Sequence, residues 1–301
     1  MIPSVVPVVS AQQDVKMQII EVYNKFKKCG SVTTDSRTLK GGEMFFALKG
    51  ENFDGNEYAL KALEAGAAYA VVNADSEVGK VDDPRLVKVE DTLKTLQELA
   101  RWHRSMTFVD GKPLTVIALT GMDRVEVARE SIRAVLSVKY DVTAAEDGMD
   151  DALSVPLTLL KINSQTNIAI VAMKAERPGD IKRQVDVALP NYGLITNVDK
   201  DDLRGFESFE EMSATLGELY DYLRRTSDKV FLNVDDPYLC RMASDRNLQS
   251  DPERPYSLVL PYGIELQNSA DLPAETVAAL AVGAYFGVQR EDALKAVEPY
   301  L

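Results

Sequence analysis

The sequence has few of the residues from which catalytic and metal sites are commonly built. Among its 301 residues there is one histidine, His103, and there are two cysteines, Cys29 and Cys240. The cysteines lie far apart and lack metal-ligand spacing, so we expect reduced thiols in a cytoplasmic protein. A single histidine beside Trp102 gives no basis for a Ser/His/Asp or Cys/His catalytic arrangement, and we expect it to be structural.

Positive charge and long apolar runs are also scarce. The 34 Lys and Arg residues are outnumbered by 47 Asp and Glu residues, which gives a net charge of −13 and an isoelectric point of about 4.7. Nucleic acid and anionic membranes are poor partners for a protein of this charge. No apolar stretch approaches the roughly 20 residues of a transmembrane helix, so no membrane span is expected.

What the chain does have is enough apolar sequence for two domains. Hydrophobic residues make up 46% of its length, and the chain exceeds the usual size of one domain. Residues 1–15 carry no Lys or Arg ahead of their apolar stretch, which favours a loose leader over a signal peptide. We expect a first domain over residues 16–110 and a second over residues 112–301.

Residues 16–110 alternate between helical and strand patterns, which predicts a small α/β domain. Helices are expected over residues 16–29, 57–65 and 92–106, and buried strands over residues 44–48, 70–72 and 86–89. Gly66 is placed to end the second of these helices. Polar turns are expected over residues 34–37 and 49–56.

The second domain is expected to contain a mostly parallel sheet covered by helices on both faces. Apolar, β-branched strand candidates alternate with helical segments and lie at residues 114–119, 142–145, 167–172, 192–196 and 230–233. An Ala-rich helix is expected over residues 274–285. Ligands of such sheets lie at the carboxyl ends of the strands, so the candidate functional loops follow Leu119, Ala145, Ala172 and Thr196.

The first of these loops is where a phosphate-binding loop is expected. A buried strand turns through Gly121 and enters a helix expected over residues 127–138. Such a loop normally offers glycine, lysine and threonine, which meet phosphate and Mg²⁺ through backbone N–H groups, an ammonium and a hydroxyl. This chain has Arg124, Val125 and Glu126 instead.

Several longer segments are more specific than this pattern. In the first domain they are TDSR (34–37) and FFALKGENFDGN (45–56); in the second they lie at residues 155–160, 194–198, 217–223 and 231–236. Together they resemble the Mur ligase family, MurF type, over nearly the whole chain after the leader. The resemblance implies a MurF-type N-terminal domain and a central domain like that of P-loop NTPases. It also implies ATP- and Mg²⁺-dependent joining of D-Ala-D-Ala to UDP-MurNAc-tripeptide.

The catalytic positions of the family are substituted in this chain. The loop glycine, lysine and Mg²⁺-binding hydroxyl correspond to Arg124, Val125 and Glu126; a metal-binding glutamate, a histidine and a carbamylated lysine correspond to Ala172, Asp202 and Leu216. We therefore expect a catalytically inactive pseudoenzyme that binds neither ATP nor Mg²⁺ and has no catalytic or metal site. Vestiges of the nucleotide site would be Gly121, Asn197 and Asp235. The family's third domain is expected to be absent, because the chain stops at Leu301.

The loops of the first domain, in contrast, match the family pattern. By resemblance, the UDP moiety would be bound by Asp35, Ser36, Arg37, Lys49, Gly50 and Asn52. The Asp, Ser, Gly and Asn residues among them are also ordinary turn formers, and both interpretations stay open. The expected role is binding, regulation or scaffolding in peptidoglycan precursor metabolism, with a UDP-MurNAc-peptide or a cell-wall enzyme as possible partners. The alternatives are a truncated or unconventional MurF-type ligase and a purely structural protein-interaction module.

Overall fold

The structure is a computed structural model, and it divides the chain into two compact units. The units comprise Met1–His103 and Arg104–Leu301, so the division falls near the end of a helix, a few residues before the expected limit at residue 110. The residues that the structure describes are 8–50, 53–145, 151–203, 205–226, 228–248, 259–264 and 271–301, with backbone alone for 8–16 and 151–152.

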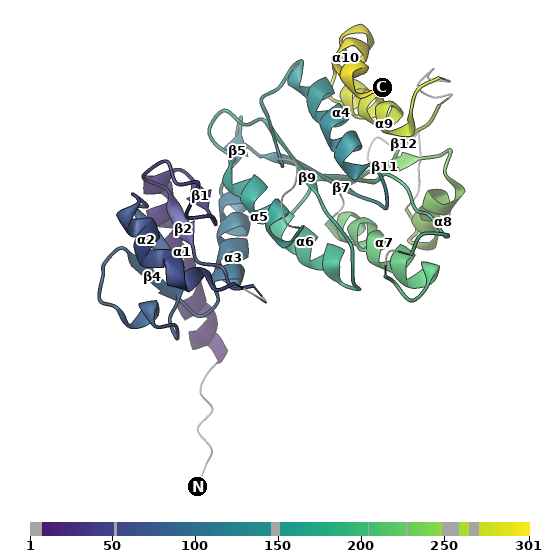
Figure 1. The fold of residues 1–301 in the computed structure, drawn as a ribbon. Coiled ribbons are helices and arrows are strands. Elements are labelled where there is room, and N and C mark those ends of the chain that lie inside the picture. Colours follow the sequence, from purple (N-terminus) through teal and green to yellow (C-terminus); the bar gives the residue numbers. More distant parts are fainter. Residues whose placement is uncertain are drawn as a thin grey trace. The chain divides into compact units, whose positions relative to one another are not determined.

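The smaller unit contains a four-stranded parallel sheet (Figure 1). In spatial order the strands are β1 (Val32–Thr33), β2 (Met44–Phe46), β3 (Tyr69–Asn73) and β4 (Leu86–Val89). The helices are α1 (Val8–Cys29), α2 (Ala59–Glu64) and α3 (Thr92–Ser105), with short 3₁₀ helices η1 (Gly55–Tyr58) and η2 (Val78–Lys80). Apolar side chains of the strands and α2, among them Phe45, Val72 and Leu63, form the core of this unit.

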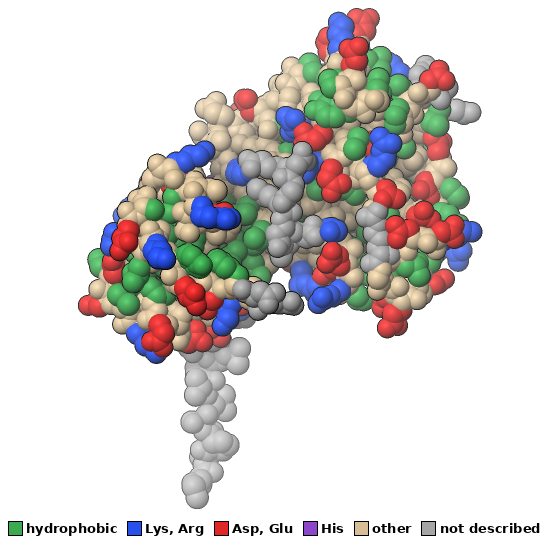
Figure 2. Space-filling view, in the orientation of Figure 1, with side chains coloured by type: hydrophobic (Ala, Val, Ile, Leu, Met, Phe, Trp, Pro, Cys, Tyr) green, Lys and Arg blue, Asp and Glu red, His purple; other side chains and the backbone are tan. Residues whose placement is uncertain are grey.

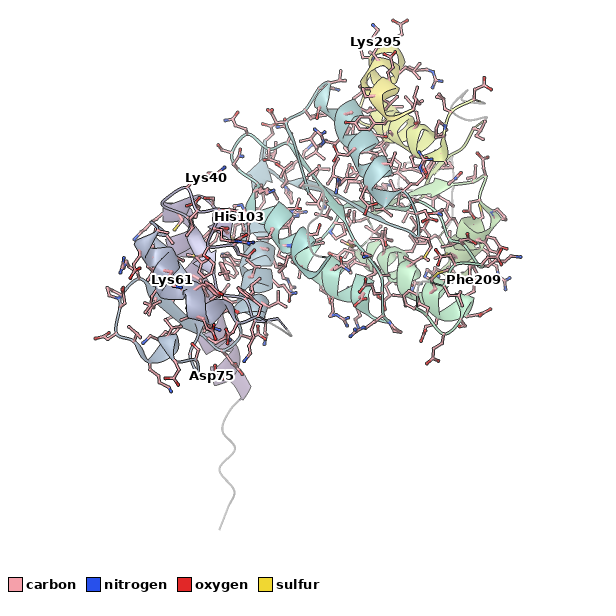
Figure 3. All side chains as sticks on the ribbon, in the orientation of Figure 1. Lys40, Lys61, Asp75, His103, Phe209 and Lys295 are labelled. Atoms are coloured by element: carbon pink, nitrogen blue, oxygen red, sulfur yellow. The ribbon has the colours of Figure 1, made fainter. Side chains whose placement is uncertain are left out.

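Helix α1 begins at Val8, whereas the sequence predicted a loose segment up to residue 15 and a helix only from Lys16. The residues from Val8 to Lys16 contain neither proline nor glycine, so nothing in them interrupts the helix. Farther along, Phe26 of this helix packs edge-on against His103 of α3, with ring centroids 5.2 Å apart. Figure 3 labels His103 in the smaller unit. The histidine thus lies among aromatic side chains of the smaller unit.

The larger unit is built on a six-stranded parallel sheet in the order β12-β11-β10-β7-β9-β8. The strands are β7 (Thr115–Thr120), β8 (Val142–Ala144), β9 (Ile168–Ala172), β10 (Tyr192–Ile195), β11 (Lys229–Asn233) and β12 (Val259–Tyr262). A short antiparallel hairpin, β5 (Phe108–Val109) with β6 (Lys112–Pro113), precedes the sheet. This architecture confirms the predicted α/β class with a mostly parallel sheet, although β12 was not predicted.

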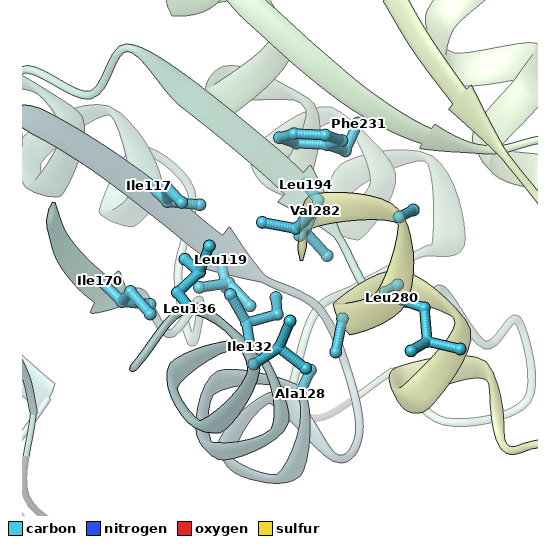
Figure 4. Packing of buried hydrophobic residues seen from close by; sticks show 14 of the residues in the cluster. Ile117, Leu119, Ala128, Ile132, Leu136, Ile170, Leu194, Phe231, Leu280 and Val282 are labelled. Atoms are coloured by element: carbon cyan, nitrogen blue, oxygen red, sulfur yellow. The ribbon is translucent and has the colours of Figure 1, made fainter. Parts of the chain in front are cut away.

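Helices cover both faces of this sheet (Figure 1). They are α4 (Val125–Ser137), α5 (Asp151–Leu160), α6 (Asp180–Ala188), α7 (Phe209–Thr226), α8 (Pro237–Asp245), α9 (Ala274–Tyr285) and α10 (Arg290–Val297), followed by η3 (Glu298–Tyr300). On one face α4 and α9 pack on Leu119, Ile170 and Phe231 (Figure 4). On the other face α7 approaches β10 closely. The approach depends on Gly193, since a Cβ atom there would lie 2.7 Å from the Leu223 side chain.

The order of the strands determines where a ligand can bind. From β7 the chain goes to β8 at one edge of the sheet and returns through β9, and it then crosses to β10 on the other side of β7. The direction of winding therefore reverses at β7. In sheets of this kind the crevice beside the reversal, at the carboxyl ends of the strands, is the usual binding site.

The surface carries charges of both signs. Lys and Arg side chains are interspersed with Asp and Glu on the visible face of each unit (Figure 2). Within the described ranges, no helix combines the length and apolar character that crossing a bilayer requires.

Candidate functional site

A cavity of about 450 Å³ opens beside the turn that precedes β2 in the smaller unit. Its lining residues are Thr34, Asp35, Ser36, Arg37, Phe45, Phe53 and Tyr58. Three of the six candidate UDP-binding residues, Asp35, Ser36 and Arg37, are therefore together at one site. The rings of Phe53 and Tyr58 stack with centroids 5.3 Å apart and an interplanar angle of 20°. The cavity thus combines a polar turn that carries a cation with a flat aromatic surface.

The polar turn is organised by Asp35. Arg37 donates from Nε to Asp35 Oδ1 at 2.9 Å and from Nη2 to Oδ2 at 2.7 Å, and its backbone N–H also donates to Oδ1 at 2.9 Å. These hydrogen bonds from Arg37 lower the pKa of Asp35 to about 2. The Arg37 side chain nevertheless stays 86% exposed. A charged, oriented guanidinium is therefore available to an anionic ligand.

The loop with Lys49 and Gly50 supports the cavity by positioning the Phe53 ring. Lys49 and Asp54 form an isolated antiparallel bridge, and Lys49 Nζ lies 3.8 Å from Asp54 Oδ2. Gly50 donates its backbone N–H to the carbonyl oxygen of Phe53 at 2.8 Å, which helps to position that ring. Among the described residues, neither Lys49 nor Gly50 lines the cavity, and Asn52 lies outside the described ranges.

Buried amide groups hold the end of this loop. Asn56 Nδ2 donates to Asp54 Oδ1 at 2.7 Å and to Asn73 Oδ1 at 3.0 Å, while the backbone N–H of Asn73 donates to Asn56 Oδ1 at 2.9 Å. Asn56 therefore ties the loop to β3. The stack of Phe53 and Tyr58 was not predicted from the sequence, because it depends on this anchoring and not on a local pattern.

In the larger unit, the loop between β7 and α4 is held by the loop after β10. A Cβ atom at Gly121 would lie 2.0 Å from Thr196 Oγ1, so only glycine fits there. Met122 donates its backbone N–H to Asn197 O at 3.3 Å, and Asp123 donates to Asn197 Oδ1 at 3.0 Å. Two of the predicted vestigial residues, Gly121 and Asn197, are thus brought together.

The three substituted loop residues have different environments. Arg124 has left-handed backbone geometry, with φ of +55°, directly before α4, and its Nε lies 3.2 Å from Glu275 Oε1. Val125 is buried in the first turn of α4, and Glu126 is exposed. The backbone still runs from strand through turn to helix, but Arg124 provides the only cation between Gly121 and Glu126.

The remaining substituted positions do not form a cluster of charged groups. Ala172 ends β9 opposite Leu119 of β7, and Leu216 is fully buried in α7. Asp202 is half-buried in the loop between β10 and α7. No group of three or more His, Cys, Asp or Glu residues that could hold a metal ion was found in the part of the chain that the structure describes.

A second cavity, of about 400 Å³, lies at the carboxyl ends of β10, β11 and β12. It is lined by Val198, Asn233, Asp235, Asp236, Pro237, Tyr238, Ile264, Ala274 and Val277. Asp235, the third predicted vestigial residue, accepts a hydrogen bond from the backbone N–H of Ile264 at 2.6 Å. Asp236 accepts the N–H groups of Tyr238 and Leu239 and so caps α8. Carboxylate and amide groups therefore line one side of a partly apolar cavity.

A parallel sheet of this order, with a turn into a helix after β7 and a cavity at its carboxyl edge, defines a doubly wound α/β domain with a candidate ligand site at the ends of its strands. The sequence matches the family described as Mur ligase middle domain over residues 125–280. Residues 28–104 match the model described as Mur ligase family, catalytic domain. The chain therefore belongs to the Mur ligase family, as the resemblance predicted.

Two similar curated proteins are named UDP-N-acetylmuramoyl-tripeptide–D-alanyl-D-alanine ligase. The Bacillus subtilis protein is 30% identical over 88% of this chain and 60% of its own length. The Escherichia coli protein is 32% identical over 63% of this chain and 40% of its own length. The chain thus spans about 40 to 60% of the length of these relatives.

Solved MurF structures share the fold. MurF from Acinetobacter baumannii superimposes with a TM-score of 0.74 at 18% identity, covering 94% of this chain and 67% of that one. MurF ligase from Thermotoga maritima in complex with ADP gives a TM-score of 0.64 at 25% identity, covering 78% of this chain and 50% of that one. The predicted MurF-type resemblance is confirmed.

These relatives overturn two expectations from the sequence. The chain was expected not to be an enzyme, yet its relatives are named ligases, so that expectation is wrong. It was also expected to bind neither ATP nor Mg²⁺, and this too is contradicted, because a similar MurF was solved with ADP. A strand–loop–helix frame attracts phosphate through backbone N–H groups and the helix dipole as well as through side chains. Substitution at Arg124, Val125 and Glu126 therefore does not by itself exclude nucleotide.

Proposed function

We propose that this chain is the precursor- and nucleotide-binding part of an ATP-dependent ligase of the MurF type. The reaction would join D-Ala-D-Ala to UDP-MurNAc-tripeptide, as the names of its relatives indicate for those proteins. The observation that supports this proposal best is the 450 Å³ cavity, because it contains the Asp35-Ser36-Arg37 turn that resembles the family's substrate-binding loop.

The chemistry of this cavity suits a uridine diphosphate group. The exposed Arg37 guanidinium is held in a fixed orientation by Asp35, and it can donate two parallel hydrogen bonds to a phosphate. The stacked rings of Phe53 and Tyr58 offer a flat apolar surface for a pyrimidine base. The Ser36 hydroxyl can donate to or accept from a ribose or phosphate oxygen.

The 400 Å³ cavity of the larger unit suits the nucleoside part of ATP. Asp235 and Asp236 can accept hydrogen bonds from ribose hydroxyls or from an exocyclic amine, and Asn233 can both donate and accept. The phosphates would then point towards the loop between β7 and α4, where the start of a helix favours negative charge.

The fit for Mg²⁺ is weaker than the fit for nucleotide. In nucleotide sites this ion binds chiefly to phosphates and water and takes one or two carboxylates from the protein. Asp123 and Glu126 are the carboxylates of the loop, and both are exposed. Any metal contact from this loop would therefore come from them and not from a hydroxyl.

Precursor binding is tested by calorimetry with UDP and with UDP-MurNAc-tripeptide. We expect Arg37→Ala and Phe53→Ala each to weaken binding of both ligands at least about tenfold, since each removes a charge-assisted bond or a stacked ring. Arg85→Ala is a matched control, because Arg85 makes the same two bonds to Asp83 at 3.1 and 2.7 Å but does not line the cavity. Equal loss in all three variants would contradict the assignment of this cavity.

Ligase activity is tested with the complete gene product, UDP-MurNAc-tripeptide, D-Ala-D-Ala and ATP. We expect phosphate release that depends on both substrates, together with an amide-linked product detected by mass spectrometry. Precursor binding without any ATP turnover would overturn the ligase proposal and leave the assignment of the first cavity standing.

A further inference from the structure

One ion pair joins the β7–α4 loop to the wall of the 400 Å³ cavity. Arg124 Nε lies 3.2 Å from Glu275 Oε1. Glu275 is in the first turn of α9, and its neighbours Ala274 and Val277 line the cavity. A nucleotide with its nucleoside in this cavity and its phosphates at the start of α4 would pass next to this pair.

We propose that Arg124 binds the nucleotide phosphates, in place of a lysine from the loop, and that Glu275 positions its guanidinium. This inference rests on the nucleotide binding proposed above. It assigns the cationic role to a residue that stands where the family pattern has glycine, while Val125 occupies the place of the family's lysine.

The geometry of the ion pair leaves the outer part of the guanidinium available. An arginine side chain has five N–H donors, and Glu275 is placed to accept from Nε. Within the described ranges no second carboxylate lies within ion-pair distance of Arg124. Its side chain is 52% exposed, whereas that of Glu275 is 14% exposed. A nearly buried carboxylate therefore holds one edge of the guanidinium, and both terminal nitrogens are left for the two-pronged contact that phosphate favours.

The charges around the loop favour such a cation. Asp123 and Glu126 stand on either side of Arg124 in the sequence and would repel a di- or triphosphate. Lys174, after the neighbouring strand β9, lies 3.2 Å from Glu176. Within this loop, the positive charge of Arg124 therefore offsets part of the negative charge of the two carboxylates.

The backbone at Arg124 supports the same conclusion. Its φ of +55° places a long side chain in left-handed geometry, where a non-glycine residue costs roughly 1–2 kcal/mol. Backbone strain of this type is concentrated at ligand-binding sites. A purely structural tether is a weaker explanation, because an ion pair whose arginine is half exposed contributes little to stability.

The experiment measures binding of ADP and of adenosine by calorimetry to the wild type and to Arg124→Ala. We expect the Kd for ADP to rise about 10- to 100-fold in the variant, the usual effect of losing a charge-assisted hydrogen bond. The Kd for adenosine should not change, because adenosine carries no phosphate. Arg225→Ala is the matched control, since Arg225 is an exposed arginine that pairs with Asp186 from a different helix.

Two further variants separate positioning from direct contact. Arg124→Lys keeps the charge without the planar donor pair, and its Kd for ADP should lie between those of the wild type and Arg124→Ala. Glu275→Gln should weaken ADP binding in the wild type but have no further effect in the Arg124→Ala background, because it acts through the arginine.

The possible outcomes are distinguishable. If the wild type binds ADP and Arg124→Ala binds it equally well, the role of Arg124 is overturned and the proposed function stands. If Arg124→Ala weakens adenosine as much as ADP, the residue is structural and the inference is likewise overturned. If the wild type binds no ADP, the inference fails together with the nucleotide part of the proposed function.

Discussion

Gly121 and Thr196 are so close that a Cβ atom at position 121 would stand 2.0 Å from the Thr196 hydroxyl oxygen. The contact joins the ends of the neighbouring strands β7 and β10, where the backbone N–H of Thr196 also donates to Thr120 O at 2.8 Å. It therefore determines how the chain leaves β7 and enters the loop before α4.

A methyl group at position 121 is expected to destabilise the larger unit. Gly121→Ala should lower the free energy of unfolding by about 1–3 kcal/mol in urea titrations, because the new atom overlaps its neighbour. Combining it with Thr196→Ala removes the nearest atom, so the additional cost of Gly121→Ala should be smaller in that background. Equal costs in both backgrounds would show that this contact is not the cause.

The backbone strain at Arg124 predicts that the Arg124→Gly variant is more stable than the Arg124→Ala variant. Both Arg124→Gly and Arg124→Ala remove the ion pair with Glu275, but only glycine adopts a φ of +55° without cost. The glycine variant should therefore unfold with a free energy about 1 kcal/mol higher than the alanine variant. Thermal and urea unfolding of the two proteins compare them directly, and an equally stable alanine variant would contradict the assignment of strain.

Asn56 is expected to be important for the stability of the smaller unit. It is buried, and its amide bonds to both Asp54 and Asn73. Asn56→Ala should cost about 1–3 kcal/mol, because buried partners lose their hydrogen bonds. Asn24→Ala, on the exposed side of α1, serves as the control and should change stability by less than about 0.5 kcal/mol.

The pair formed by Asp35 and Arg37 predicts a measurable titration. Hydrogen bonds from Arg37 lower the pKa of Asp35 in the folded protein from 3.8 to about 2. The contribution of this pair to stability is therefore complete above about pH 4 and is lost as the pH falls through about 2. Carbon-detected NMR of the Asp35 carboxyl group should give this low value, and Arg37→Ala should return it towards 3.8. An unchanged midpoint in the variant would rule out the arginine as the cause.

Local elements were predictable where the pattern of residues was long or sharply bounded. Strand β4 and helix α9 occupy the predicted residues 86–89 and 274–285. Strand β12 was missed because it contains Pro261, which normally argues against a strand. It is tolerated because β12 lies at the edge of the sheet, where one side needs no hydrogen-bond partner.

The site was predictable only as far as its residues are neighbours in the sequence. Asp35, Ser36 and Arg37 form one turn, and a short motif was enough to predict that they lie together, as they do along one cavity. Phe53 reaches the same cavity through the fold of its loop, which the bridge between Lys49 and Asp54 and the bonds of Asn56 to β3 hold in place. The contacts of Arg124 with Glu275 and of Gly121 with Thr196 join distant segments, and no local pattern of residues indicates either of them.

The position of β7 has a consequence for the synthesis of this protein. Its partners on both sides, β9 and β10, come later in the chain, and Ile195 is made roughly 75 residues after Thr120. At about 5–20 residues per second, the ribosome needs roughly 4–15 s to supply the second partner. During that interval the apolar strand TVIALT has an unpaired edge, the kind of segment that pairs wrongly with other chains. The nascent chain therefore carries an aggregation-prone edge at β7 until β10 emerges, and slower translation would prolong that interval.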